Sequence, residues 1–233
     1  MPGYTYSTFV TAIAAEMVVG PTDSDFLAIL PTLIDDSEQR IYRELDLLTS
    51  VVTVNGTATA NSRTFTLPTS GSMGTIHFLV IDAINVLDAT SIRHPVKPAT
   101  REGVDFLYPG ENSLSTPCYP GVFCRADDLS IIYGPAPDST YTVEVIGTIR
   151  PAPLSATNTS TYLSLYLSDL FLAGAMVSAS GYMRNFGSQG DDPRMSVSWE
   201  SQFQTRLASA KKEELRKSYI AAMSTPPSSM KDA

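Results

Sequence analysis

Between Asp25 and Leu48, apolar residues recur at three- and four-residue spacing, which predicts one long amphipathic helix. Its apolar stripe consists of Leu27, Leu30, Ile34, Ile41, Leu45 and Leu48, with Ser37 on the same face. Asp36 and Arg40 have the spacing of a surface ion pair, which contributes only about 0.3–0.5 kcal/mol. Pro31 either kinks this helix or marks a restart. Burial of the stripe contributes far more free energy than such surface pairs, so we expect partner helices to cover it.

A first helix precedes this one. It is predicted to begin at Thr5, a favourable N-cap residue, and to run to about Val19. Its stripe consists of Phe9, Ile13 and Met17. Gly20-Pro21 ends the helix, and Thr22 or Asp23 then caps the long helix, so the two form a helical hairpin with a short connection.

Two more helices are predicted near the end of the chain. The third begins at Thr159 or Ser160 and runs to about Phe186, and the fourth begins with a cap at Asp192 followed by Pro193. One face of the third helix carries apolar and small residues: Leu163, Leu167, Leu170, Gly174, Val177 and Gly181. The stripe of the fourth contains Met195, Trp199, Phe203, Leu207 and Ala210. The small residues allow a neighbouring helix to approach closely.

The middle of the chain changes to a two-residue period that is typical of strands. From Val51 onward, β-branched and aromatic runs alternate with turn residues, which predicts antiparallel strands. The clearest predicted hairpin pairs residues 129–133 with residues 141–149. Between Ala89 and Pro120 turn formers dominate, so we expect long loops there.

These patterns predict an α+β fold in which the N- and C-terminal segments form a four-helix bundle around an inserted antiparallel β-rich domain. The expected domains are residues 1–50 and 158–222 for the two halves of the bundle, 51–157 for the β-rich domain and 223–233 for a flexible C-terminal tail. The expected bundle core consists of Leu27, Leu30, Ile34, Ile41, Leu45, Leu170, Val177, Trp199, Phe203 and Leu207.

Charge and hydropathy narrow the class of protein. The formal net charge of −8 argues against general binding of a phosphate backbone. The most apolar run, Tyr162 to Met183, is long enough to span a membrane, but it contains Asp169 and several serines, which favours a buried bundle helix. The N-terminal residues show no basic region followed by an apolar run, so we expect no secretory signal.

Candidate chemistry is sparse. His77 and His94 lie near no nucleophile motif, and together with Cys118 and Cys124 they lack the spacing of a zinc site. A lone pair of cysteines in a chain without a secretory signal indicates free thiols rather than a disulfide framework. The pairs Asp127-Asp128 and Asp191-Asp192 suit either a divalent cation or turn and cap chemistry, the latter being the commoner role. We therefore expect no catalytic residue, metal or cofactor. Glu38 and Glu44 are assigned to a charged helix face, and a peptidoglycan hydrolase or a generic binding module remains the alternative.

The order of elements resembles that of a known family. The runs PTLIDDSEQRIYRELDLL, LFLAGAMVSASGYMRNF and WESQFQTRLASAKKEELRKSY, with a β-rich middle, are similar to the head-to-tail adaptor proteins of short-tailed bacteriophages. The resemblance implies a non-enzymatic virion protein, assembled in the host cytoplasm as a dodecameric ring beneath the portal protein. Such a ring extends the channel for double-stranded DNA, serves in DNA ejection and offers a platform to tail nozzle or fibre proteins, without a membrane. The expected portal-docking residues are Lys211, Lys212, Arg216, Lys217 and Tyr219, near the end of the fourth helix.

Overall fold

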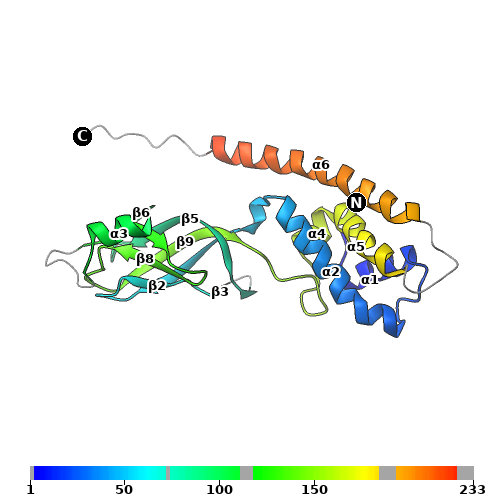
Figure 1. Cartoon of the computed structure of the whole chain (residues 1–233), viewed down its shortest axis with the longest axis horizontal. Coiled ribbons are helices and arrows are strands. Elements are labelled where there is room, and N and C mark those ends of the chain that lie inside the picture. Colours follow the sequence, from blue (N-terminus) through cyan, green and yellow to red (C-terminus); the bar gives the residue numbers. More distant parts are fainter. Residues whose placement is uncertain (1–2, 72–73, 111–117, 184–192, 225–233) are drawn as a thin grey trace. The chain divides into compact units, whose positions relative to one another are not determined.

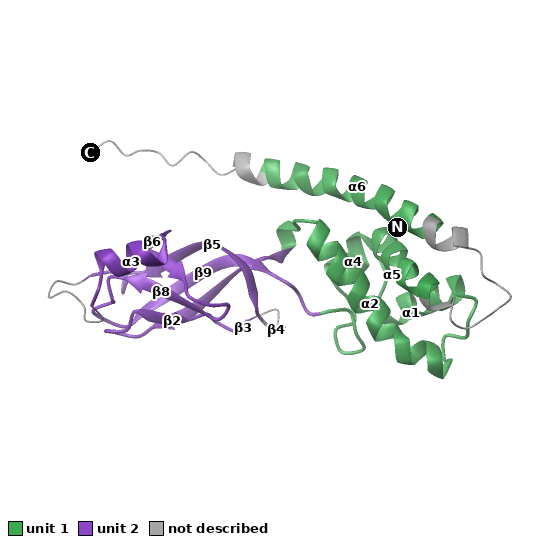
Figure 2. Cartoon of the chain, viewed as in Figure 1, with its two compact units in different colours: residues 1–49, 153–233 green, residues 50–152 purple. Residues whose placement is uncertain are grey.

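The computed structural model describes residues 3–71, 74–110, 118–183 and 193–224 (Figure 1). The chain divides into two compact units (Figure 2). Residues 1–49 and 153–233 form one, here called the helical unit, and residues 50–152 form the other, the β unit. Each unit has its own hydrophobic core.

The helical unit is built on α5, which packs against α1, α2, α4 and α6 (Figure 1). The α-helices of this unit are α1 (Tyr6–Glu16), α2 (Ser24–Glu44), α4 (Tyr162–Tyr166), α5 (Ser168–Met183) and α6 (Pro193–Ser224). A short 3-10 helix, η1 (Leu48–Ser50), follows α2. The start of α6 at Pro193 agrees with the prediction, whereas the proposed cap at Asp192 lies outside the described residues.

The N-termini of α1 and α2 are capped as the sequence predicts. Thr5 accepts a hydrogen bond from the Thr8 backbone N–H, and the Thr8 side chain accepts one from the Thr5 N–H, which is a capping box. Asp23 accepts hydrogen bonds from the backbone N–H groups of Asp25 and Phe26. These side chains satisfy amide groups that have no partner within their own helix.

The α2 helix runs without interruption through Pro31, so of the two alternatives, a kink or a restart, the restart is absent. Proline cannot donate a hydrogen bond to the carbonyl four residues earlier, which here belongs to Leu27. Both residues lie on the exposed side of the helix, and 42% of Leu27 is exposed. Water can therefore solvate that carbonyl, and the apolar face of the helix is undisturbed.

The predicted third helix is instead two helices, α4 and α5, separated by Leu167. Its cap is neither Thr159 nor Ser160. Thr161 accepts from the Ser164 backbone N–H at 3.2 Å, and the Ser164 hydroxyl accepts from the Thr161 N–H at 3.0 Å. This capping box starts the helix one to two residues later than predicted.

The β unit contains a seven-stranded sheet of order β1-β9-β5-β6-β7-β8-β2 and a small β3-β4 pair (Figure 1). The bounds are β1 (Val51–Ala58), β2 (Thr64–Thr66), β3 (Ser70–Gly71), β4 (Gly74–Thr75), β5 (Phe78–Leu87), β6 (Arg93–Pro98), β7 (Val122–Arg125), β8 (Ser130–Gly134) and β9 (Tyr141–Ile149). A short helix, α3 (Arg101–Leu107), packs on β7 and β8.

The two ends of the seven-stranded sheet approach one another, so the sheet nearly closes into a barrel. A Cβ atom added to Gly56 on β1 would lie 2.7 Å from the Phe65 ring on β2, which is too close for any larger residue. Phe65 is 2% exposed and belongs to the core of the unit. Gly56 thus permits the close approach of β1 and β2, the two edge strands of the sheet.

The predicted fold class, a four-helix bundle with an inserted antiparallel domain, is wrong. The described residues form six α-helices together with the nearly closed sheet, although the mixture of helices and strands does agree with an α+β assignment. One strand pair, β6 with β7, is parallel. The helices exceed four because Leu167 divides one predicted helix and because α3 forms within the β unit.

The predicted hairpin between residues 129–133 and 141–149 is also wrong. The first of these segments becomes β8, which pairs with β7 and β2, while the second becomes β9 between β1 and β5. β9 is central and apolar, so it gains more by pairing on both edges with long strands than by pairing with its neighbour in sequence.

The predicted loops between Ala89 and Pro120 contain regular structure. Residues 93–98 form β6 despite Pro95 and Pro98, and α3 begins after a Thr100 cap. Val96, which is 6% exposed, and Val104, which is fully buried, attach these elements to the unit. Tertiary contacts thus override the local preference of prolines and glycines for turns. Residues 111–117 of this region lie outside the described part of the chain.

Candidate partner-docking surface

The five predicted docking residues divide into two groups in the structure. Lys211 forms an ion pair with Glu44 of α2 at 3.1 Å. Lys217 donates hydrogen bonds to Glu214 at 2.7 Å and to the Tyr162 hydroxyl at 2.6 Å. These two lysines bind α6 to the rest of the helical unit, so a partner would have to compete with internal contacts to reach them.

Lys212, Arg216 and Tyr219 point away from the helical unit. Both cations are exposed, and neither has an acidic partner within 4.0 Å among the described residues. Tyr219 is 64% exposed. Lys212 and Arg216 are four residues apart, so their like charges lie side by side on one face of the helix.

Two exposed apolar residues near these three were not predicted from the sequence. Leu215 is 68% exposed and Ile220 is 66% exposed, and both lie on α6 among the predicted residues. We call Lys212, Leu215, Arg216, Tyr219 and Ile220 the α6 docking surface. The sequence could have indicated them, because Leu215 and Ile220 fall outside the apolar stripe on the buried face of the helix. Tyrosine and arginine beside exposed aliphatic groups are typical of binding hot spots.

The opposite face of α6 holds the helix in place. Its buried residues, Phe203, Leu207, Ala210 and Glu214, repeat at three- and four-residue spacing and are at most 6% exposed. Arg206 adds a hydrogen bond to the Asp169 backbone carbonyl at 2.8 Å. The docking surface is therefore presented by a helix whose inner face is fixed.

Most residues of the expected bundle core are buried. The relative exposures are 0% for Leu30, 2% for Ile34, 0% for Ile41, 4% for Leu45, 1% for Leu170, 0% for Phe203 and 2% for Leu207. Val177 and Trp199 are partly buried and pack against this core. Leu27 and Leu48 are exposed, whereas Phe26 and Leu33, which the predicted stripe omits, are buried. The buried face of α2 is thus rotated slightly from the predicted one in its first turns.

Glu38 is buried rather than charged and solvated as predicted. It is 3% exposed and accepts a hydrogen bond from the Leu154 backbone N–H at 3.2 Å. Burial, partly opposed by this hydrogen bond, raises the pKa of Glu38 to about 7. The Glu38 carboxyl therefore holds the segment that returns from the β unit.

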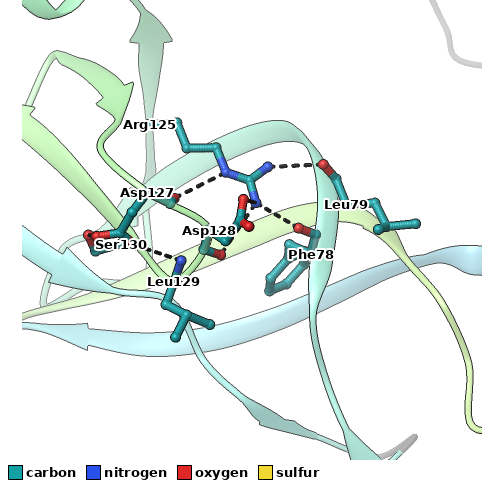
Figure 3. Close-up of polar contacts among 7 residues, drawn as sticks. All are labelled: Phe78, Leu79, Arg125, Asp127, Asp128, Leu129 and Ser130. Carbon is teal, nitrogen blue, oxygen red and sulfur yellow. Dashed lines mark hydrogen bonds and ion pairs between the residues drawn. The ribbon is translucent and has the colours of Figure 1, made fainter.

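In the β unit, one arginine gathers a dense set of polar contacts (Figure 3). Arg125 donates to the backbone carbonyls of Phe78, Leu79, Asp127 and Asp128, at 2.8 to 3.3 Å. Asp127 accepts from the Leu129 N–H and the Ser130 hydroxyl, and the Ser130 hydrogen bond foremost lowers its pKa. Asp127 therefore serves turn chemistry, and Asp128 faces Arg125 at 3.4 Å. The second acidic pair, Asp191-Asp192, lies outside the described residues.

Three exposed apolar residues lie in the region where long loops were predicted. Ile92 is 58% exposed, Phe106 85% and Leu107 59%. Phe106 and Leu107 end α3, which Asp105 holds through an ion pair with Arg63 at 2.7 Å. These residues are the candidate contact points of the β unit.

The histidines and cysteines do not form a reactive centre in the described part of the chain. His77 is exposed, and His94 stacks on Tyr119 with ring centroids 4.2 Å apart. Cys118 and Cys124 are free thiols. Across the described ranges, no group of three or more His, Cys, Asp or Glu side chains is arranged to hold a metal ion. No helix within those ranges is both long and apolar enough to cross a membrane.

The chain is therefore an α+β protein. Its α6 helix has a buried inner face and an exposed cationic and aromatic outer face, and its β unit carries exposed apolar side chains. Comparison with known families gives the particular family. Residues 4–226 match the SU10 adaptor protein family, so this chain belongs to that family of bacteriophage adaptor proteins. No curated protein matches the chain.

Proposed function

We propose that the chain is a structural virion protein, a head-to-tail adaptor that docks as a ring beneath the portal protein, extends the DNA channel and carries the next tail component. The family match over residues 4–226 supports the adaptor role. The α6 docking surface is the single observation that carries the portal contact. It combines two cations that have no acidic partner among the described residues with exposed aromatic and aliphatic groups, on a helix whose inner face is buried. This role requires no catalytic residue.

The portal contact is assigned to Lys212, Arg216 and Tyr219 with Leu215 and Ile220. Of the five docking residues expected from the sequence, Lys211 and Lys217 support the helix and leave the contact to the other three. The cations attract an acidic surface on the portal, and the apolar groups supply the area that is removed from water. Of the proposed flexible tail, residues 223–233, the first two residues are the end of α6, and residues 225–233 lie outside the described residues.

Neighbouring lysines provide a matched test. Lys212→Ala and Arg216→Ala should each weaken binding to the portal by about tenfold or more, and Tyr219→Ala should do the same, as is usual for interface hot spots. Lys211→Ala removes the same charge one residue away, where it faces Glu44. It should leave portal affinity within about twofold of the wild type. Wild-type affinity in a Lys212, Arg216 and Tyr219 triple variant would refute the docking assignment.

For the β unit we propose contact with downstream nozzle or fibre proteins through Ile92, Phe106 and Leu107. The adjacent exposed side chains of Phe106 and Leu107 at the end of α3 support this, because contiguous apolar surface can mark a binding site. Phe106→Ser should impair attachment of the distal tail, while Val80→Ser, exposed elsewhere in the same unit, should not. If Phe106→Ser instead disrupts the ring and spares distal assembly, these residues contact neighbouring adaptors.

In the assembled particle, the proposed ring is a dodecamer of identical subunits through which double-stranded DNA passes. The net charge of −8 supports this part of the proposal, because a negatively charged protein does not hold a phosphate backbone tightly. A count of subunits in the portal-bound complex by native mass spectrometry tests it.

A further inference from the structure

A buried carboxylate lies directly beneath the α6 docking surface. Glu214 is 6% exposed and precedes Leu215 and Arg216 in sequence. It accepts hydrogen bonds from the Lys217 ammonium at 2.7 Å, from the Tyr162 hydroxyl at 3.3 Å and from the Leu48 backbone N–H at 3.4 Å. Three donors from three elements thus meet on one side chain.

Lys217 lies on α6 itself, whereas the other two donors lie near the places where the chain leaves and re-enters the helical unit. Leu48 begins η1, and the β unit starts two residues later at Ser50. Tyr162 begins α4, the first helix after the chain returns. Glu214 is therefore the point where α6 is bound to the outgoing segment of the chain.

Lys217 contacts both Glu214 and Tyr162. Its ammonium lies 5.3 Å from the centroid of the Tyr162 ring and donates to the Tyr162 hydroxyl, which in turn donates to Glu214. Partial burial disfavours the charged lysine, but hydrogen bonds to Glu214, Tyr162 and Glu213 outweigh it and raise the pKa of Lys217 above its usual value. The lysine remains charged and compensates the buried carboxylate.

The adjacent glutamate has a different environment. The side chain of Glu213 is 58% exposed, and its one ion pair among the described residues is with Lys217, at 3.0 Å. The returning segment is held separately, by Glu38 of α2 through the Leu154 N–H. Glu214 on α6 thus accepts from the outgoing segment, through the Leu48 N–H, and from α4, through the Tyr162 hydroxyl.

We propose that Glu214 is a positioning residue that couples the α6 docking surface to the outgoing segment at Leu48. The docking half of this inference rests on the proposed portal contact, whereas the anchoring half does not. A partner that immobilises Leu215 and Arg216 also immobilises Glu214, and so protects the Leu48 amide. Such coupling is reciprocal, so loss of the hydrogen bond between Leu48 and Glu214 also lowers the affinity of the partner for α6.

Hydrogen exchange in the free, full-length chain tests the anchoring. Glu214→Ala should speed exchange of the Leu48 amide by about tenfold or more, and Glu214→Gln, which keeps an acceptor oxygen, should restore most of the protection. Glu213→Ala is the matched control and should leave Leu48 unchanged. Protection of the α5 amides, which lie in the same unit as Glu214 and Leu48, reports whether each variant is folded. Equal Leu48 exchange in the wild type and in folded Glu214 variants would overturn the inference.

Addition of the portal protein tests the coupling. Portal should slow Leu48 exchange in the wild type and in Glu213→Ala but not in Glu214→Ala, which should also bind portal about tenfold more weakly. A purely structural role for Glu214 would not produce this selective loss of response. Portal-induced protection that persists in Glu214→Ala refutes the coupling. If portal binds no variant, the proposed function fails, while the exchange of the free chain still decides the anchoring.

Discussion

Arg40 on α2 holds Glu200 on α6 through two hydrogen bonds, of 2.8 and 2.5 Å, and its guanidinium carbon lies 4.1 Å from the centroid of the Phe203 ring. The sequence suggested a pair between Asp36 and Arg40 within one helix, and this was wrong. A planar guanidinium gains two parallel hydrogen bonds and an aromatic contact by reaching across to α6, which no neighbour on α2 offers.

Removal of this contact should weaken the packing of α6 against α2. The side chains of Arg40 and Glu200 are 32% and 38% exposed, so solvent screens the pair and its coupling energy should be about 1 kcal/mol. Arg40→Ala should cost about 1–2 kcal/mol in the free energy of unfolding, since the contact with Phe203 is lost as well. A double-mutant cycle with Glu200→Gln, followed by urea unfolding, measures the coupling. Asp36→Ala is the control, and a coupling between Asp36 and Arg40 as large as that between Arg40 and Glu200 would contradict the assignment.

Stability should depend on pH through Glu38. The pKa of this carboxyl is about 7 in the folded chain against an ordinary value of 4.5. The folded state therefore binds the proton more tightly than the unfolded state. The resulting stabilisation is complete below pH 4.5, declines as the pH rises towards 7 and is lost above that value. The difference is on the order of 3 kcal/mol.

Glu38→Gln should remove this dependence. Urea unfolding at about pH 5 and about pH 8 should show a smaller loss of stability in Glu38→Gln than in the wild type, and the variant should be the more stable of the two at the higher pH. Asp36 is exposed on the same helix, so Asp36→Asn should keep the wild-type dependence of the free energy of unfolding on pH. An unchanged slope in Glu38→Gln would show that another group titrates.

Two glycines of α5 should respond in opposite directions to the same substitution. A Cβ atom at Gly174 would lie 3.0 Å from the Ser37 hydroxyl and 3.2 Å from the Phe203 ring, so Gly174→Leu should overpack the core and cost roughly 1–3 kcal/mol. At Gly181 a Cβ atom would meet nothing within 4 Å. There Gly181→Leu should stabilise the helix by up to about 1 kcal/mol. Thermal unfolding compares the two variants, and destabilisation by both would mean that α5 is packed differently.

Val18 should be replaceable with a gain in stability. It is 90% exposed and has a φ of 55°, in the left-handed region that β-branched residues avoid. Val18→Gly should therefore stabilise the chain by about 1 kcal/mol, whereas the same change at the partly buried Val19 should destabilise it. Chemical unfolding of both variants is the measurement. A loss of stability in Val18→Gly would indicate that the valine side chain makes a contact worth more than the backbone strain.

Features that depend on local periodicity were predictable from the sequence. Helical spacing places Leu30, Ile34 and Ile41 on one buried face of α2, and Thr5 and Asp23 have the chemistry of N-caps. Strand-like runs anticipate β1, β5 and β9 because each contains a long series of β-branched residues.

Features that depend on distant partners were not predictable in this way. The sequence pattern predicts that Glu38 is a charged surface residue. Its burial depends on Leu154, 116 residues later in the chain, whose backbone N–H donates a hydrogen bond to it. The pairing of β9 with β1 and β5, and the folding of β6 and α3, are likewise decided by tertiary contacts. For the docking surface, the sequence pointed to the cations, but only the structure shows that Lys211 and Lys217 are paired internally.

The central claim, that this adaptor docks on the portal, is tested most directly by measuring the mass of the chain alone and mixed with the portal of the same particle, by light scattering or native mass spectrometry. The account predicts a portal-bound ring for the wild type and for Lys211→Ala, and its loss in the triple variant of Lys212, Arg216 and Tyr219. A chain that keeps the same mass with and without portal would contradict the proposed function.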